Sequence, residues 1–199
     1  MIVFEDSVGL IEQGILTQGE LQTLKDFIVE ECTITPTDVN WLNTVIFEWN
    51  DIDNYTGYWR ADFVVDDNDN IVDVDATIVS NVAYLRNLRS LKRAFSHEYG
   101  HHWTLSYYAV SQNVNIWNER LPWEYYNSRG IDENQYRSDY TNGWHFCDKE
   151  VIAEDYRVSF TPFKTNHRMV NADSPTQLDS PSKEVADFIW CLAKPSGWL

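Results

Sequence analysis

The first third of the chain has one clear helical pattern, followed by a turn and an ambiguous segment. Residues 17–31 carry apolar side chains at helical spacing, and Thr17 and Glu20 form a capping box at their start. Residues 35–40 are typical of a turn, and residues 41–49 fit either a strand or a short helix. We therefore expect a helix over residues 17–31 and leave the element after the turn open.

Residues 57–80 favour a β-hairpin. Residues 58–65 and 71–79 are rich in β-branched and aromatic side chains, which are typical of strands. The acidic and amide residues at 66–70 have the chemistry of a turn. They resemble the start of a calcium-binding loop, but the glycine at the sixth position and the glutamate at the twelfth are absent. A polar turn is therefore the interpretation that we adopt.

The rest of the chain is predicted to be mainly helical. Residues 83–109 repeat apolar side chains at helical spacing without an intervening proline, and residues 148–160 and 182–194 favour two further helices. Residues 110–147 form a long aromatic connection with one or two short helices, and residues 165–182 form a polar loop. Together with the hairpin, these elements predict the α+β class.

The length of the chain fits a single domain over residues 1–199, built from two lobes. The N-terminal lobe, about residues 1–109, would contain the hairpin and the long helix. The C-terminal lobe, about residues 110–199, would contain the later helices. We expect this domain to be a monomer.

The acidic composition limits the partners of the chain. The formal net charge of −16 repels nucleic acid and anionic membranes, so neither is expected as a partner. No stretch of the sequence approaches the ~18 apolar residues of a membrane-spanning helix. Three cysteines without a Cys-x-x-Cys pair argue against a disulfide scaffold and against a thiolate zinc site. The first ten residues lack the features of a signal peptide, so we expect a soluble protein, either cytoplasmic or secreted after an export signal absent from this chain.

The segment with the most specific chemistry is HEYGH at residues 97–101, in the middle of the predicted long helix. His97 and His101 are four residues apart and so lie on one helical face, where two imidazoles can reach one zinc ion. Glu98 lies beside that face, where it can accept a proton from an attacking water without binding the metal itself. The segment therefore predicts a zinc site with Glu98 as general base.

A third protein ligand is needed to complete a catalytic zinc site. The continuation HExxHxxGxxH is excluded, because Thr104 and Tyr107 stand at its glycine and histidine positions. Glu150 and Glu154 lie one turn apart on the predicted helix over residues 148–160. One of them could bind zinc while the other accepts the free ring N–H of a ligand histidine. The pattern alone leaves open which glutamate has which role.

HEYGH followed by EVIAEDYR at residues 150–157 resembles the gluzincin metallopeptidases, and is most similar to the anthrax lethal factor and Pro-Pro endopeptidase type. The resemblance covers roughly residues 85–160. It implies a zincin-like fold, in which a small mixed sheet or hairpin packs on the active-site helix and a mainly helical C-terminal lobe follows. It also implies these roles: zinc ligands His97, His101 and Glu150, catalytic base Glu98, and Glu154 as hydrogen-bonding partner of a ligand histidine.

The resemblance also implies a tyrosine shortly before the ligand glutamate, where it donates a hydrogen bond to the oxyanion. Tyr140 lies a few residues too early for a clean match. His145 is a rival in the same stretch, since a histidine can also donate to an oxyanion. Both residues are therefore candidates for oxyanion stabilisation.

Together these residues predict a zinc-dependent endopeptidase that acts on a peptide or protein substrate. By analogy with the fold, the hairpin over residues 57–80 would offer its edge to an extended peptide. Aromatic side chains between residues 103 and 146 would partly line the binding site and suit a proline-rich peptide or a glycan. One alternative is a catalytically silent zincin-like module that binds a peptide or glycan, and another is a regulatory peptidase that cleaves one dedicated partner. The intact Glu98 argues against the silent module.

Overall fold

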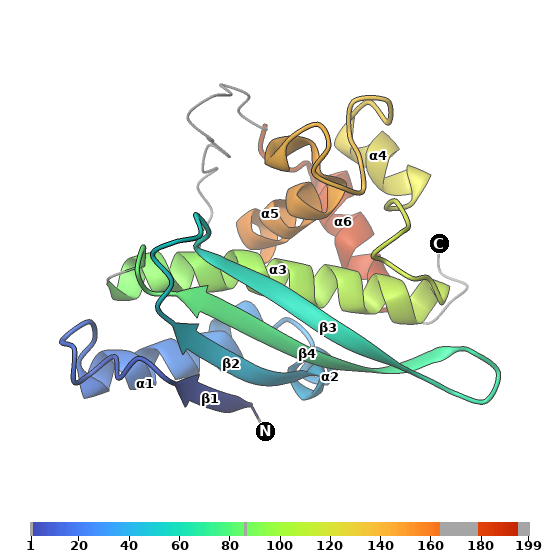
Figure 1. Ribbon diagram of the computed structural model, residues 1–199. Coiled ribbons are helices and arrows are strands. Elements are labelled where there is room, and N and C mark those ends of the chain that lie inside the picture. The colour runs from blue at the N-terminus through green and yellow to red at the C-terminus, as the bar shows by residue number, and fades with distance from the viewer. Residues whose placement is uncertain (1, 86, 164–178, 195–199) are drawn as a thin grey trace. The chain divides into compact units, whose positions relative to one another are not determined.

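The computed structural model describes residues 2–85, 87–163 and 179–194 (Figure 1). The chain divides into two compact units, Met1–His102 and Trp103–Leu199. The boundary falls within one continuous helix, α3 (Leu88–Gln112). Most of the polar loop predicted over residues 165–182 lies outside the described residues.

The first unit is built around a four-stranded mixed sheet with the strand order β1-β2-β4-β3. β1 (Val3–Asp6) pairs in parallel with β2 (Leu42–Glu48), and β2 pairs in parallel with β4 (Ile71–Asn81). β3 (Gly57–Val65) pairs antiparallel with β4 and forms one edge of the sheet. In Figure 1, β3 and β4 continue as a twisted two-stranded ribbon beyond the ends of β1 and β2.

The predicted hairpin is confirmed, and so is the polar turn at its tip. Asp66 Oδ1 accepts the backbone N–H groups of Asn68 and Asn70 at 2.9 Å each. Asp69 adopts a positive φ of 61°, which aspartate tolerates better than most residues. The acidic side chain of Asp66 therefore closes the turn by bonding the backbone.

The helices between β1 and β2 differ from the prediction in their bounds. α1 (Gln18–Phe27) begins with the predicted capping box, in which Thr17 Oγ1 accepts the Glu20 backbone N–H at 3.2 Å and Glu20 accepts the Thr17 N–H at 2.9 Å. A π-helical turn, η1 (Ile28–Cys32), follows where the pattern predicted a continuing α-helix. The short helix α2 (Pro36–Trp41) takes the place of the turn predicted over residues 35–40, so that prediction is wrong. α2 leads directly into β2, and the ambiguous segment is mainly a strand.

The core of the first unit lies between the sheet and the beginning of α3. Val45 and Phe47 on β2 are fully buried, and the Phe47 ring meets the Phe95 ring of α3 edge to face at 5.9 Å. Burying one such side chain contributes about 1.5–3 kcal/mol to folding. This contact anchors α3 on the sheet just before its histidines.

Helix α3 begins five residues later than predicted and ends three residues later. Asn87 accounts for the start, because its Oδ1 accepts the Ser90 backbone N–H at 2.9 Å in the manner of an N-cap. Asn113, with a φ of 54°, stops the helix at its other end. The predicted helix is thus confirmed, with shifted bounds.

The second unit is mainly helical and contains α4 (Trp123–Arg129), the 3-10 turn η2 (Trp144–Phe146), α5 (Asp148–Phe160) and α6 (Lys183–Leu192). α6 contacts both α4 and α5. α5 has the predicted bounds, and α6 lies within the predicted range. The mixed sheet and these helices confirm the α+β class. None of the described helices combines the length and the apolar character needed to cross a membrane.

A buried polar network fixes α5 within the second unit. Asp148 accepts hydrogen bonds from the Leu121 backbone N–H and the Tyr126 hydroxyl, both at 2.9 Å. Asp155 accepts from the Tyr125 hydroxyl at 2.8 Å and lies 2.9 Å from Arg129 Nε. Burial raises the pKa of Asp155 to about 7, against the opposing effect of Arg129. Because these partners come from the segment before α5, the network holds the helix in one orientation.

Candidate metal and catalytic site

His97 and His101 lie one turn apart on α3, as their spacing predicts. Their ring centroids are 4.9 Å apart, and the ring planes are nearly perpendicular at 88°. His101 is buried and His97 is half-buried. The helix therefore brings two imidazoles close enough together to share one metal ion.

A polar cluster anchors the opposite face of α3. The Tyr99 hydroxyl donates to Asp38 Oδ2 at 2.5 Å, and His102 Nε2 donates to the Asp38 carbonyl oxygen at 2.8 Å. Burial lowers the pKa of His102 to about 4, so this histidine is neutral and its proton stays on Nε2. Because successive residues turn by about 100°, anchoring Tyr99 and His102 also sets the direction in which His97 and His101 point.

Glu98, on α3, is 5% exposed and faces the first residue of the edge strand β3. A Cβ built on Gly57, the first residue of β3, would be 3.3 Å from Glu98 Oε1 and 3.4 Å from Glu98 Cγ. The glycine therefore leaves room for the carboxylate. Nothing in the sequence pattern singled out Gly57.

Glu150 lies in the first turn of α5, where the helix dipole favours a carboxylate. It is 4% exposed, and its Oε1 accepts the Tyr140 hydroxyl at 2.7 Å. Tyr140 itself is 60% exposed. Of the two candidate oxyanion donors, Tyr140 is therefore the one with a described hydrogen bond to a predicted metal ligand.

Backbone hydrogen bonds join the two ends of the loop that carries Tyr140. The Arg137 N–H donates to the Phe146 carbonyl, and the Asp148 N–H donates to the Arg137 carbonyl, each at 2.8 Å. The buried Lys149 ammonium donates to the Ser138 carbonyl at 2.8 Å. These contacts hold the loop against the start of α5.

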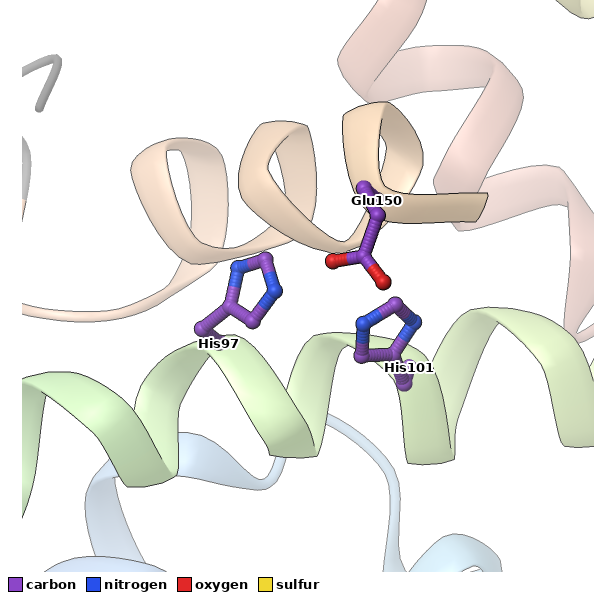
Figure 2. Close-up of side chains that lie close together, drawn as sticks. All are labelled: His97, His101 and Glu150. Atoms are coloured by element: carbon purple, nitrogen blue, oxygen red, sulfur yellow. The ribbon is translucent and has the colours of Figure 1, made fainter. Parts of the chain in front are cut away.

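Among the described residues, His97, His101 and Glu150 form a group that could hold a metal ion (Figure 2). Each residue offers one ligand atom, and these atoms all lie within 4.8 Å of one another. Ligands at about 2.0–2.1 Å from a tetrahedral zinc lie roughly 3.4 Å apart, so small side-chain adjustments would suffice. Two imidazoles and one carboxylate are a donor set that suits zinc, and they leave the fourth position open for water or substrate.

Glu154 and His145 have other described contacts. Arg157 donates to both carboxylate oxygens of Glu154, from Nε at 2.8 Å and from Nη2 at 2.5 Å. The His145 ring packs against the Phe146 ring, with centroids 4.1 Å apart. The predicted bond from Glu154 to a ligand histidine stays a prediction. Sequence reasoning missed the role of Arg157, although its position three residues after Glu154 is the helical spacing of an ion pair.

The aromatic residues predicted to line a binding site are divided between core and surface. The buried ones include Trp103, Tyr107, Tyr108, Tyr125, Tyr126 and Tyr136. The exposed ones are Trp117, Trp123, Tyr140 and Trp144. Most of the aromatic content thus builds the second unit rather than a surface.

No protein-family model matches the chain, and searches of curated proteins and of solved structures find no match either.

Proposed function

We propose that this chain is a zinc-dependent endopeptidase, with His97, His101 and Glu150 as zinc ligands and Glu98 as general base. The observation that carries the proposal is the grouping of the three ligand atoms within 4.8 Å. Glu98 follows the first ligand directly in sequence and is buried. A buried carboxylate beside such a group is the arrangement that water activation requires.

Zinc, when held by these three residues, supplies Lewis acidity, which lowers the pKa of water toward ~7 and polarises a carbonyl group. Glu98 accepts the proton of the attacking water and delivers it to the departing amine. Because Glu98 is on α3 between the two histidines, it can reach the water without taking a ligand position itself.

Tyr140 is the favoured donor to the developing oxyanion. Its hydroxyl already lies 2.7 Å from Glu150 Oε1, and a small rotation of an exposed side chain would redirect it to a substrate oxygen. His145 is the alternative donor, from the same loop.

The proposal extends to a zincin-like arrangement of the first unit and to an extended substrate. β3 is an antiparallel edge strand, and a Cβ at its first residue would lie 3.3 Å from Glu98 Oε1. A peptide that pairs with this edge would place its backbone beside the general base. The net charge of −16 favours neutral or basic peptides over acidic ones.

The test is the digestion of a peptide library by zinc-loaded wild type and by Glu98→Gln. We expect the wild type to cleave, and the variant to keep its zinc and lose at least about 10²–10³-fold in rate. Glu124→Gln, at an exposed glutamate of α4, is the matched control and should cleave like the wild type. A wild type that carries one zinc per chain and cleaves nothing would overturn the proposal in favour of a silent binding module.

A further inference from the structure

The side-chain alternation of β3 shows where a side chain at position 57 would point. Trp59 is buried, whereas its neighbours Tyr58 and Arg60 are exposed. Since alternate residues of a strand face the same side, position 57 faces the interior together with Trp59. Gly57 is therefore a half-buried position on the same face of the edge strand as Trp59, with no side chain.

The interior space at Gly57 is already occupied. A Cβ there would lie 2.7 Å from the Val79 carbonyl oxygen, closer than real Cβ atoms come. It would also lie 3.3 Å from Glu98 Oε1 and 3.4 Å from Glu98 Cγ. The Val79 carbonyl belongs to the paired backbone of β4, so a methyl group would force the strand to shift there and would also press on the Glu98 side chain.

The backbone around Gly57 has little freedom to move away. The Asn81 N–H donates to the Thr56 carbonyl at 2.9 Å. The Asn81 side-chain amide donates to the Tyr55 carbonyl at 3.0 Å and to the Asn50 carbonyl at 2.6 Å. Asn81 is buried, and its backbone and side chain both bond the segment that leads into β3, so this segment is fixed in place.

We propose that Gly57 is a positioning residue for the general base. Because it has no side chain, Gly57 leaves to the Glu98 carboxylate the place that a Cβ would take between α3 and the first residue of the edge strand. This inference rests on the proposed function for its kinetic consequence, but its structural part, the crowding of Glu98 by a side chain at position 57, does not depend on activity.

Gly57→Ala should lower kcat by about 10-fold or more, because a general base displaced by a fraction of an ångström loses its alignment with the water. The zinc content should stay at the wild-type level, since Glu98 is not a ligand, and KM should change little. In the Glu98→Gln background the same substitution should cause no further loss, because the group that it displaces is already inactive. Gly19→Ala is the matched control: Gly19 lies in α1 with nothing within 4 Å of an added Cβ, so its activity should be that of the wild type.

A second measurement needs no activity. In zinc-free protein, Gly57→Ala should lower Tm by at least about 2 °C more in the wild-type background than in Glu98→Ala, where the crowded carboxylate is gone. If Gly57→Ala fails to fold, recovery of folding in the double variant with Glu98→Ala would support the inference, whereas failure in both backgrounds would assign the need for glycine to the Val79 carbonyl and overturn it. Unchanged kcat in zinc-loaded Gly57→Ala, or equal losses of Tm in both backgrounds, would overturn the inference. If the wild type shows no peptidase activity at all, the proposed function fails, and the Tm comparison alone decides the role of Gly57.

Discussion

Tyr99→Phe removes one hydroxyl from the cluster that anchors α3 on the side away from the histidines. That hydroxyl donates to Asp38 Oδ2 at 2.5 Å, and both residues are fully buried. In the variant, the Asp38 carboxylate still accepts the hydrogen bond that the Thr35 hydroxyl donates. A hydrogen bond to a charged group contributes about 1.5–3 kcal/mol, and an ion left poorly solvated in the interior costs more. We therefore expect a loss of about 2–3 kcal/mol in the free energy of unfolding at pH 8.

The expected loss depends on pH in a direction that follows from Asp38. Burial raises the pKa of Asp38, while the bonds from Thr35 and Tyr99 lower it. Removing the Tyr99 hydroxyl raises the folded-state pKa of Asp38 further. A carboxyl whose pKa is higher in the folded than in the unfolded state destabilises the fold as the pH rises from the unfolded-state pKa to the folded-state pKa. That pH interval is therefore wider in the variant, and the variant loses more stability across it. At low pH the carboxyl is protonated in both proteins, and the loss should fall to that of a neutral hydrogen bond, about 1 kcal/mol.

The assay is urea unfolding of the metal-free protein at pH 8 and pH 3, with Tyr108→Phe as the matched control. Tyr108 donates to a neutral acceptor, the Arg120 carbonyl, at 3.1 Å, so its loss should be about 0.5–1.5 kcal/mol at both pH values. The reasoning is refuted if Tyr99→Phe costs no more than Tyr108→Phe at pH 8, or if its cost is the same at both pH values.

Three further predictions concern the site and its support. Tyr140→Phe should keep its zinc and lose about 10²–10³-fold in kcat, while His145→Ala should change little; steady-state kinetics that show the reverse would assign the oxyanion to His145. Arg157→Met removes both described donors from the buried Glu154 carboxylate and should cost about 3–5 kcal/mol in urea unfolding, which a loss below 1 kcal/mol would contradict. Chelation should abolish activity and zinc should restore it; zinc at a hundredfold excess over its Kd should add about 2.7 kcal/mol of stability, and an unchanged Tm would count against specific binding.

Features that depend on near neighbours in the chain were predictable. The capping box at Thr17, the turn at residues 66–70 and the bounds of α5 each follow from residues within about four positions of one another. The His97 and His101 pair belongs to the same class, because helical periodicity alone puts both rings on one face.

Features that depend on distant residues were not predictable. β1 is four residues long and mostly exposed, so it shows no alternation, and its parallel pairing joins Val3 to Thr44. The π-helical turn at Ile28–Cys32 continues the apolar stripe of α1 and so has the pattern of an α-helix. The closeness of Glu98 to the place where a Cβ at position 57 would lie depends on how a helix packs on a strand, and it has no signal in local composition.

Local spacing in the sequence also could not decide whether Glu150 or Glu154 is the third metal ligand. Both glutamates lie on one face of α5, so periodicity treats them alike. Their different contacts distinguish them: Glu154 is paired with Arg157, whereas Glu150 accepts the Tyr140 hydroxyl and groups with the two histidines. The ion pair could have been anticipated from the i,i+3 spacing, but the hydrogen bond from Tyr140 depends on the fold of its loop.

The most direct test of the proposed zinc site is the metal content of protein purified without added zinc, for wild type, Glu150→Ala and Glu154→Ala side by side. We predict close to one zinc per wild-type chain, loss of most of it in Glu150→Ala, and retention of most of it in Glu154→Ala. A wild type that binds no transition metal even after reconstitution, or a Glu150→Ala variant that keeps its zinc, would contradict the proposed site.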